Sequence, residues 1–467
     1  CHQAGIGVIL DFVPVHFAVD GYALNHYDGT TLYEYPEKED NYSEWGSCNF
    51  IHARGEVCSF LQSCANYWMD VFHFDGLRMD AVSRLIYWGG DPNRGTNPSS
   101  INFLKRMNQG LHQLHPEGML IAEDSTNYEG VTCPVEYGGL GFDYKWDMGW
   151  MNDTLHYMQT DFPWRPGNHG LLTFSIMYAF TENFICPLNH DEVVHGKCSL
   201  IGRMPGDWWR QFAGLRTLAF YQMTHPGAKL NFMGNEIGQF IEWRYYESIQ
   251  WFLTEEYETH RHHQAFIKAL NHLYTAEPAL YERGYTDDGF TWIDADNSKQ
   301  SIVSFVRQGE DVDDDLVILI NFDPASYESF RVGVPREGDW EVIFDSDRPE
   351  FGGSGYAGEE PYTCSSEPYP WNGQMDSIEI KVPGLAGVVL KRRGPSSYKP
   401  PVVEEPKKAT RKRTSSVKPK PAAAKKAPAK AKAAKPAAKT AKAKKATTKK
   451  AAPKAKSASV KSSAKDA

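Results

Sequence analysis

Three carboxylates in this sequence follow short apolar segments and are placed for acid–base or nucleophilic chemistry: Asp80, Glu123 and Asp191. Arg78 stands two residues before Asp80, and alternate residues of a β-strand point to the same side, so we expect its guanidinium beside that carboxylate. Such a neighbour keeps a carboxylate ionised, as a nucleophile requires. Glu123 follows the apolar Leu120–Ala122, a setting that raises the pKa of a carboxyl group and suits a general acid.

Each of these signals has a structural alternative when taken alone. An Arg–x–Asp sequence is commonly a structural ion pair, and Glu123 could equally cap a helix. Taken together, three carboxylates at successive strand ends are what cleavage of a glycosidic bond with retention needs. One attacks the anomeric carbon, the second protonates the leaving oxygen and later acts as a base, and the third stabilises charge or binds sugar hydroxyls. This chemistry requires no metal or organic cofactor, and we predict none.

Three further residues are candidates for the same site. Asp11 lies near the end of another apolar segment, His16 follows it, and His190 directly precedes Asp191. A lone histidine such as His16 is also often a structural residue. The stretch His190–His195 has two histidines five positions apart, whereas a zinc-binding metalloprotease helix needs them four apart, so we predict no metal site there.

The elements that position these residues are indicated by the apolar segments. Short apolar runs alternate with helix-like stretches over the first 285 or so residues, which is typical of a parallel sheet buried on both faces. Helical patterns lie between the runs, for example over Val57–Phe74 and Ile101–Leu114. The predicted strands are Val8–Val13, Gly76–Ala81, Leu120–Asp124, Gly141–Trp146, Phe184–Asn189 and Lys229–Glu236.

Ionisable residues lie at or near the ends of these runs, the last of them Glu236. Parallel α/β barrels carry their active sites at the carboxyl ends of the strands, and doubly wound sheets bind ligands there too. No glycine-rich phosphate loop opens a helix, and Gly138–Gly141 is better explained as a turn. The pattern therefore predicts an α/β fold and leaves both architectures open.

The remainder of the chain changes character twice. After a helical pattern over His260–Glu282, alternating strands such as Ser301–Gln308, Asp314–Phe322 and Ser377–Lys381 indicate an antiparallel domain. The last segment consists mainly of Lys, Ala, Pro, Ser and Thr and cannot bury enough apolar surface to fold alone. We therefore predict a catalytic domain over residues 1–285, an all-β C-terminal sandwich over 286–393 and a disordered basic tail over 394–467.

The net charge of −9 averages two opposite parts of the chain. Residues 406–467 carry 22 Lys and Arg against the single acid Asp466, so the other 405 residues carry 28 basic and 58 acidic groups. The repeated Lys–Ala–Pro units resemble the C-terminal tails of linker histones. One interpretation is a solvating tail without a specific partner; the other is sequence-independent, salt-sensitive contact with nucleic acid or another anionic surface.

The cysteines and the hydropathy indicate where in the cell the protein is expected and whether it spans a membrane. The eight cysteines are irregularly spaced and form no Cys–x–x–Cys pair, which in a chain of 467 residues favours reduced thiols over a disulfide framework. No apolar run approaches the roughly 18 residues of a membrane span, and no secretory leader opens the sequence. We expect a cytoplasmic protein without a membrane span.

Four motifs in order resemble those of the α-amylase superfamily, glycoside hydrolase family 13. They are Asp11–His16 (DFVPVH), Gly76–Val82 (GLRMDAV), Ala122–Thr126 (AEDST) and Asn189–Val194 (NHDEVV). Other stretches resemble the bacterial 1,4-α-glucan branching enzymes within that family. These are Gly138–Trp150 (GGLGFDYKWDMGW), Val193–Lys197 (VVHGK), Arg203–Asp207 (RMPGD) and Phe232–Glu236 (FMGNE).

The resemblance implies a (β/α)8 TIM barrel with Asp80 as nucleophile, Glu123 as general acid/base and Asp191 as stabiliser of the transition state. The residues implied to line the donor sugar subsite are Asp11, His16, Arg78 and His190. The implied activity is that of a glycosyltransferase that cleaves an α-1,4-glucan, holds it as an ester on Asp80 and passes it to a 6-hydroxyl. That reaction introduces the α-1,6 branches of glycogen.

Two other functions stay open. An α-amylase-like hydrolase would use the same carboxylates with water as the acceptor, and the branching-enzyme-like stretches argue against it. A non-catalytic protein would bind glucan through the barrel and nucleic acid through the tail, and the three carboxylates argue against it. Several aromatic residues could stack on sugars, although core packing is the commoner role for each: Trp146, Trp150, Trp208, Trp209 and Trp243.

The position of the first motif predicts an incomplete barrel. In the family this motif lies on the third barrel strand, yet here its strand begins at residue 8, and only about six strands can be counted. A barrel that lacks two strands exposes two edges and cannot close. We therefore predict that the chain is a fragment of a longer enzyme and is inactive or unstable by itself.

Overall fold

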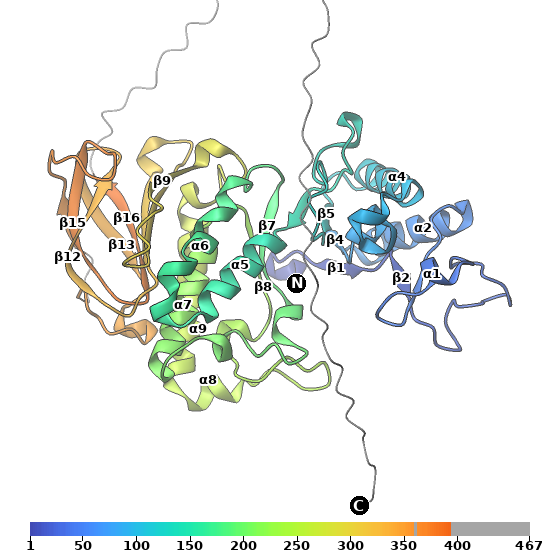
Figure 1. The fold of residues 1–467 in the computed structure, drawn as a ribbon, viewed down its shortest axis with the longest axis horizontal. Helices are drawn as coiled ribbons and strands as arrows, with labels where there is room; N and C mark the ends of the chain where they lie inside the picture. The colour runs from blue at the N-terminus through green and yellow to red at the C-terminus, as the bar shows by residue number, and fades with distance from the viewer. Residues whose placement is uncertain (359–361, 394–467) are drawn as a thin grey trace, which may run out of the picture. The chain divides into compact units, whose positions relative to one another are not determined.

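The computed structural model describes residues 1–358 and 362–393, so the predicted tail over 394–467 lies outside the described residues. Six short strands form a parallel sheet whose order in space follows the order in the chain (Figure 1). The strands are β1 (Ile9–Phe12), β4 (Gly76–Met79), β5 (Met119–Ala122), β6 (Tyr144–Trp146), β7 (Phe184–Leu188) and β8 (Ala228–Asn231). Each coincides with a predicted strand, and the predicted α/β class with about six βα units is confirmed.

The sheet has two open edges. Within residues 1–358 and 362–393, β1 and β8 each pair on one side only, so the sheet is part of a barrel rather than a closed one. The pairing aligns Asp11 with Arg78 and Arg78 with Ile121. Because parallel strands in register end at the same edge of a sheet, the residues that follow β1, β4 and β5 lie side by side.

Helices follow most of the strands. They are α2 (Gly55–Phe72), α4 (Pro98–Leu114), α5 (Met148–Gln159), α6 (Gly170–Thr173), α7 (Trp208–Thr224), α8 (Phe252–Glu256) and α9 (Glu258–Ala276). The start of α4 shows a typical cap, because Asn97 accepts the Ser100 N–H at 3.3 Å and Pro98 occupies the first helical position. Between β5 and β6 there is only a 3₁₀ turn over Val135–Tyr137, so one βα unit lacks its helix.

One predicted helix is shorter than expected. The helical pattern over His260–Glu282 corresponds to α9, which ends at Ala276. Pro278 follows, and its ring removes a backbone donor and clashes with the preceding turn, so the chain continues as a short 3₁₀ turn over Pro278–Leu280. Smaller elements complete this part of the chain: β2 (His16–Phe17), α1 (Lys38–Asn41), β3 (Cys48–Asn49) and α3 (Ser83–Ile86).

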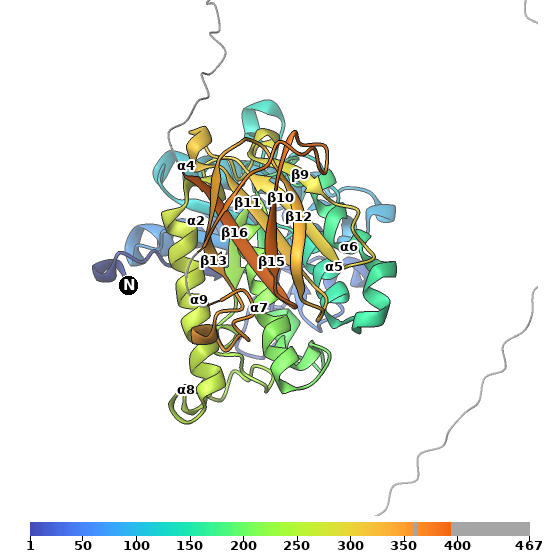
Figure 2. The same cartoon turned by 90° about the vertical axis from the view of Figure 1, so that its left-hand side faces the viewer.

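The C-terminal part is all-β, as predicted, and Figure 2 turns it toward the viewer. Its strands are β9 (Phe290–Asp294), β10 (Ile302–Arg307), β11 (Leu316–Asn321), β12 (Tyr327–Val334), β13 (Asp339–Asp345), β14 (Thr363–Ser365), β15 (Asp376–Val382) and β16 (Ala386–Arg393). Six of them form one sheet in the order β14-β13-β16-β11-β10-β9, and β12 pairs with β15. A buried cluster that includes Val332, Ile378 and Leu390 joins the two layers.

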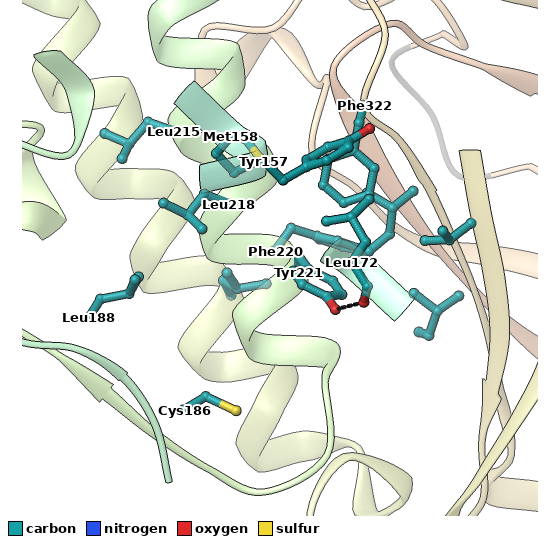
Figure 3. Packing of buried hydrophobic residues seen from close by; sticks show 14 of the residues in the cluster. Tyr157, Met158, Leu172, Cys186, Leu188, Leu215, Leu218, Phe220, Tyr221 and Phe322 are labelled. Atoms are coloured by element: carbon teal, nitrogen blue, oxygen red, sulfur yellow. Dashed lines mark hydrogen bonds between the residues drawn. The ribbon is translucent and has the colours of Figure 1, made fainter. Parts of the chain in front are cut away.

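The large sheet is buried on both faces. On β11, Val317 and Leu319 belong to the cluster under β12 and β15, whereas Leu316, Ile318 and Ile320 belong to a cluster shared with α7 and α9. This alternation is the two-residue period of a strand. Figure 3 shows part of the second cluster, in which the Tyr221 hydroxyl donates to the Leu172 carbonyl at 2.5 Å. No helix in the described part of the chain is long and apolar enough to cross a membrane.

Candidate active site

Four of the predicted site residues meet around one guanidinium. Arg78 Nη1 lies 2.5 Å from Asp11 Oδ1 and 2.9 Å from Asp80 Oδ1, and Arg78 Nη2 lies 2.8 Å from Glu123 Oε2. The side chain of Arg78 is only 7% exposed. A buried cation favours the close approach of the three carboxylates, because without them its charge would be buried and uncompensated.

The backbone after β4 orients Glu123. Ala81 directly follows Asp80 and has φ of +45°, a left-handed conformation that is unusual for a residue with a Cβ. This conformation directs the Ala81 N–H to Glu123 Oε2 at 2.8 Å, while the Val82 N–H donates to the Glu123 carbonyl at 2.8 Å. Strained residues of this kind are often found at functional sites.

Close approach of β4 and β5 depends on a glycine. A Cβ at Gly76 would lie 2.4 Å from the carbonyl oxygen of Met119, so no larger residue fits where the two strands begin to pair. Packing of β4 against β5 therefore requires a glycine at the first position of the GLRMDAV motif. This glycine allows the pairing that carries Arg78 and Glu123 to the same edge of the sheet.

A cavity of about 290 Å³ opens over the carboxylates. Five of the predicted residues line it: His16, Asp80, Glu123, His190 and Asp191. The other two do not line it. Arg78 is buried beside the carboxylates, and Asp11 lies on the edge strand β1 with 59% of its side chain exposed. The remaining lining comes from Trp45, Ala81, Ser83, Ser125 and Met148.

Both histidines of the cavity face a carboxylate. His16 Nε2 lies 3.7 Å from Asp80 Oδ2, and His190 Nε2 lies 3.3 Å from Asp191 Oδ1. Among residues 1–358 and 362–393, no group of three or more His, Cys, Asp or Glu is arranged to hold a metal ion. The donors in this cavity are thus paired with one another, and the carboxylates face a space that a sugar ring can occupy.

The electrostatic environment gives the two central carboxyls, Asp80 and Glu123, different pKa values. Burial opposes ionisation of Asp80, but the His16 ring at 3.7 Å and the charge of Arg78 outweigh it and hold the Asp80 pKa below its usual range. Burial raises the pKa of Glu123 to about 7, and Arg78 and the Ala81 N–H only partly offset that rise. A low and a high pKa on neighbouring carboxyls is the pattern of a nucleophile beside a general acid.

Two larger hollows adjoin this cavity. One of about 640 Å³ shares His190 and Asp191 with it and is lined by the aromatic rings of Trp243, Tyr245 and Tyr246. The other, of about 410 Å³, shares Ser125 and Met148 with it and lies along the segments after β5 and β6. The cavity over the carboxylates therefore adjoins two wider depressions.

The loop after β7 is held by ionic and backbone contacts. Arg203 donates to the Glu192 carbonyl and contacts the Glu192 carboxylate at 3.2 Å, and Lys197 Nζ contacts that carboxylate at 2.8 Å. Glu242 accepts the N–H groups of Gly196 and Cys198 at 3.1 and 2.7 Å. The Val193–Lys197 and Arg203–Asp207 motifs thus shape the loop that carries Asp191.

Glu236 does not join the carboxylates, although it lies near the end of the last predicted run. Its Oε2 accepts the Gly234 N–H at 2.7 Å inside its own turn, and the cavity lining does not include it. The strand β8 ends at Asn231, so Glu236 lies five residues beyond the sheet edge.

Sequence reasoning missed the surroundings of the site. Trp45 lines the cavity, and its ring centroid lies 5.3 Å from that of His16, but Trp45 stands in a segment without a recognisable motif. Of the five tryptophans considered as sugar platforms, Trp146 and Trp150 are buried, whereas Trp208 and Trp209 are exposed. Trp243 lines the 640 Å³ hollow.

Comparisons with known proteins place the fold. A family model described as "Alpha amylase, C-terminal all-beta domain" matches residues 292–393. Solved structures with the same fold include an α-amylase from Geobacillus thermoleovorans (TM-score 0.57, 14% identity, 85% of this chain and 79% of that one). A type I pullulanase from Bacillus subtilis is a second (TM-score 0.59, 14% identity, 84% and 54%). Together with the match over residues 292–393, these structures show that the chain has an α-amylase-like fold.

The chain is also similar to curated proteins that share one name. The chain is 48% identical over 403 residues to the 1,4-alpha-glucan branching enzyme GlgB of Desulfitobacterium hafniense, a match that covers 84% of this chain and 62% of the relative. It is 47% identical to the enzyme of the same name from Halothermothrix orenii, with 84% and 63% covered. The chain thus spans about three fifths of the length of these relatives.

Proposed function

We propose that this chain carries the catalytic site of a 1,4-α-glucan branching enzyme that acts on glycogen or a similar glucan. The observation that carries the proposal is the contact of Asp80 and Glu123 with one guanidinium while their pKa values lie on opposite sides of the usual range. Identity of 48% to a relative with this name supports the choice of reaction. In this proposal residues 1–285 form the catalytic part and 286–393 the C-terminal β domain.

The first half of the reaction is cleavage of an α-1,4 bond. Glu123 is the acid: its carboxyl gives a proton to the departing 4-oxygen. Asp80 Oδ1 is hydrogen bonded to Arg78 at 2.9 Å, whereas Oδ2 has the longer 3.7 Å contact with His16, so Oδ2 attacks the anomeric carbon. The product is a covalent glycosyl ester on Asp80. Asp191, at the mouth of the cavity, stabilises the positive charge that develops on the sugar ring.

The second half is transfer to a 6-hydroxyl. The Glu123 carboxylate removes the proton of an incoming glucan 6-hydroxyl, whose oxygen displaces Asp80 from the anomeric carbon. Asp80 returns as a carboxylate held by Arg78, and Glu123 is again protonated. His16 and His190 are the side chains of the cavity best placed to hold sugar hydroxyls in the donor subsite. Arg78 holds Asp80 and Glu123 from the side of the sheet, and Asp11 in turn contacts Arg78 at 2.5 Å.

The alternative is an α-amylase-like hydrolase, in which water attacks the Asp80 ester. Asp80, Glu123 and Asp191 serve both reactions equally, and the solved structures of the same fold include α-amylases. The branching reaction is favoured by the identity to the branching enzymes over 403 residues. A product assay separates the two.

The assay incubates the protein with linear amylose and follows new α-1,6 linkages by proton NMR together with new reducing ends. The proposal expects α-1,6 signals to rise with almost no net reducing ends. Reducing ends without α-1,6 signals would identify a hydrolase, and neither signal from the folded, N-terminally extended form would support the non-catalytic alternative. Asp80→Asn is the matched negative control, because it keeps the volume and removes the nucleophile.

The open edges of the sheet require two forms of the protein in this assay. One is the chain of 467 residues, and the other is the same chain with whatever natural sequence precedes Cys1 in its gene. We expect the extended form to be active and to melt at a higher temperature, because two further strands would pair with β1 and β8. Equal activity and equal melting of the two forms would contradict the prediction that the chain is a fragment.

Two further assignments belong to this proposal. All eight cysteines are free thiols, which suits a reducing compartment, and we assign the protein to the cytoplasm. The 22 Lys and Arg of residues 406–467 give that segment the charge to contact nucleic acid or another anionic surface.

A further inference from the structure

Trp146 lies against one face of the Arg78 guanidinium. The Arg78 Cζ atom is 4.4 Å from the centroid of the indole ring, a distance typical of a cation–π contact. Trp146 is the last residue of β6, and β5 lies between that strand and β4. The contact therefore joins two strands that are not direct neighbours in the sheet. The ring is 6% exposed and belongs to a small buried cluster with Ile121 and Ile185 on the two neighbouring strands.

The hydrogen bonds of Arg78 leave its orientation incompletely fixed. Arg78 Nε is buried and has no hydrogen-bond partner among the described residues. Nη2 lies 2.8 Å from the Glu123 carboxylate without the alignment of a hydrogen bond, so that contact attracts but does not orient. A guanidinium donates only in its plane. A rigid ring against its face therefore limits the tilt that the in-plane contacts leave free.

We propose that Trp146 is a positioning residue whose ring holds the Arg78 guanidinium in the plane from which it reaches Asp80 and Glu123 at once. Its consequence for catalysis rests on the proposed function, whereas its consequence for the charges of the site does not. Trp146 does not line the cavity over the carboxylates. It borders the adjoining 410 Å³ hollow but is only 6% exposed, so its main contact with the site is the one with Arg78.

The pKa values of the carboxyls that contact Arg78 depend on the orientation of its guanidinium. Asp11 on β1, Asp80 after β4 and Glu123 after β5 contact the guanidinium, and His16 and Asp191 add their own interactions with Asp80 and Glu123. The charge of Arg78 lowers the pKa of both Asp80 and Glu123. A guanidinium that tilts away therefore lets both values rise.

The test measures the pKa of Glu123 directly, by carboxyl NMR on the full chain labelled with ¹³C at glutamate Cδ, with Glu123→Gln to assign the signal. In Trp146→Met, which fills much of the space without an aromatic face, we expect the Glu123 pKa to rise above its value of about 7, by about one unit. Trp146→Phe keeps a weaker ring face and should shift it less. Trp340→Met is the matched control, because Trp340 is fully buried in the C-terminal sheets.

The same experiment contains the result that overturns the proposal. An unchanged Glu123 pKa in Trp146→Met means that the ring does not hold the guanidinium, and an equal shift in Trp340→Met means that general loosening explains it. If Trp146→Met does not fold, the smaller shift in Trp146→Phe decides in the same way. The NMR titration needs no glucan, so the pKa shift is measured whether or not the protein branches amylose. Absence of branching activity in the N-terminally extended form would refute the proposed function and leave this inference standing.

Discussion

Arg78 contacts both central carboxyls, yet they have different protonation states at neutral pH. It lies within 3 Å of Asp80, Glu123 and Asp11, but only Asp80 also has a histidine nearby, at 3.7 Å, and Glu123 is the more buried of the pair. Asp80 is consequently ionised and can attack, whereas Glu123 retains a proton over part of the neutral range. One cation thus produces an asymmetric pair because its neighbours differ.

This asymmetry predicts the pH dependence of the reaction. Glu123 must be protonated for the first step, and its pKa of about 7 means that kcat/KM should fall about tenfold per pH unit above pH ~7. The low pKa of Asp80 should place the acidic limb well below neutrality. Rates measured between pH 4 and 9 test this, with Glu117→Gln on the exposed surface as a control that should leave the profile unchanged. A rate that stays constant up to pH 9 would contradict Glu123 as the acid.

Part of the site could be predicted from the sequence. Five residues that line the cavity follow strand ends, and an apolar run before a charged residue is visible in the sequence: Asp80, Glu123, Asp191, His16 and His190. The contacts of Trp45 and Trp146 were not predictable, because each lies far along the chain from the residue that it touches and no local period marks it. Trp146 had been considered a sugar platform or a core residue, and it is a core residue with a charged neighbour.

Among the elements, the loop after β7 is held by the short segment that precedes α7. Arg203 precedes α7 by a few residues and binds both the carbonyl and the carboxylate of Glu192, which directly follows Asp191. It also donates to the Lys197 carbonyl at 2.8 Å. The RMPGD stretch therefore has a physical role in placing the third carboxylate.

Removal of this arginine should reduce turnover. In Arg203→Ala the Glu192 carboxylate keeps only Lys197, the loop shifts, and a misplacement near 1 Å lowers kcat by roughly 10- to 100-fold. Arg203→Lys restores one charge but not the fork of donors, so it should rescue activity only in part. The nearby Arg210, 46% exposed, is the control: Arg210→Ala should retain nearly full kcat. Equal kcat in Arg203→Ala and Arg210→Ala would contradict this role.

The elements themselves followed closely from the sequence. All six parallel strands lie within the predicted runs or one residue outside them, because strands buried on both faces are continuous apolar segments. The missing helix between β5 and β6 was not predicted, since glycines and prolines over that stretch indicate irregular structure without saying that a helix is replaced. The end of α9 was not predicted because the helical period of apolar residues continues past Pro278 in the sequence.

In the molecule as a whole, the helices α5, α7 and α9 with strand β7 share one buried apolar cluster with the C-terminal β domain. Phe220 on α7 is fully buried, and its ring lies 6.0 Å from that of Phe344 on β13. Gly387 on β16 touches Phe220 so closely that a Cβ there would lie 2.1 Å from the ring. Arg307 on β10 reaches the Thr224 carbonyl at the end of α7 at 2.9 Å. These contacts predict that the two parts unfold together.

Truncation of Phe220 tests this coupling. Phe220→Ala should lower the free energy of unfolding by about 3–5 kcal/mol, because it leaves a cavity between α7 and the β domain. Calorimetry should still show one transition, shifted to lower temperature. Phe174→Ala, at a residue that is 59% exposed, should change stability by less than about 0.5 kcal/mol. Two separate transitions in the wild-type protein would contradict the shared core.

The opposite charges of tail and body make a second prediction at this scale. Deletion of residues 406–467 removes 22 basic side chains and should abolish a mobility shift of duplex DNA that the full chain produces at low salt. Amylose branching should be unchanged, because no site residue lies in the deleted segment. Binding that persists after deletion, or that does not weaken as salt is raised, would contradict a tail-mediated electrostatic contact.

In the proposed mechanism, Asp80 forms a covalent bond to the transferred glucan. The most direct measurement is mass spectrometry of Glu123→Gln after incubation with α-maltosyl fluoride, whose leaving group needs no acid catalyst. Digestion with trypsin releases residues 79–84, between Arg78 and Arg84. We predict that this peptide gains the mass of one maltosyl unit on Asp80 and that Asp80→Asn shows no adduct. An adduct on another residue, or none on a folded and substrate-binding protein, would contradict the mechanism.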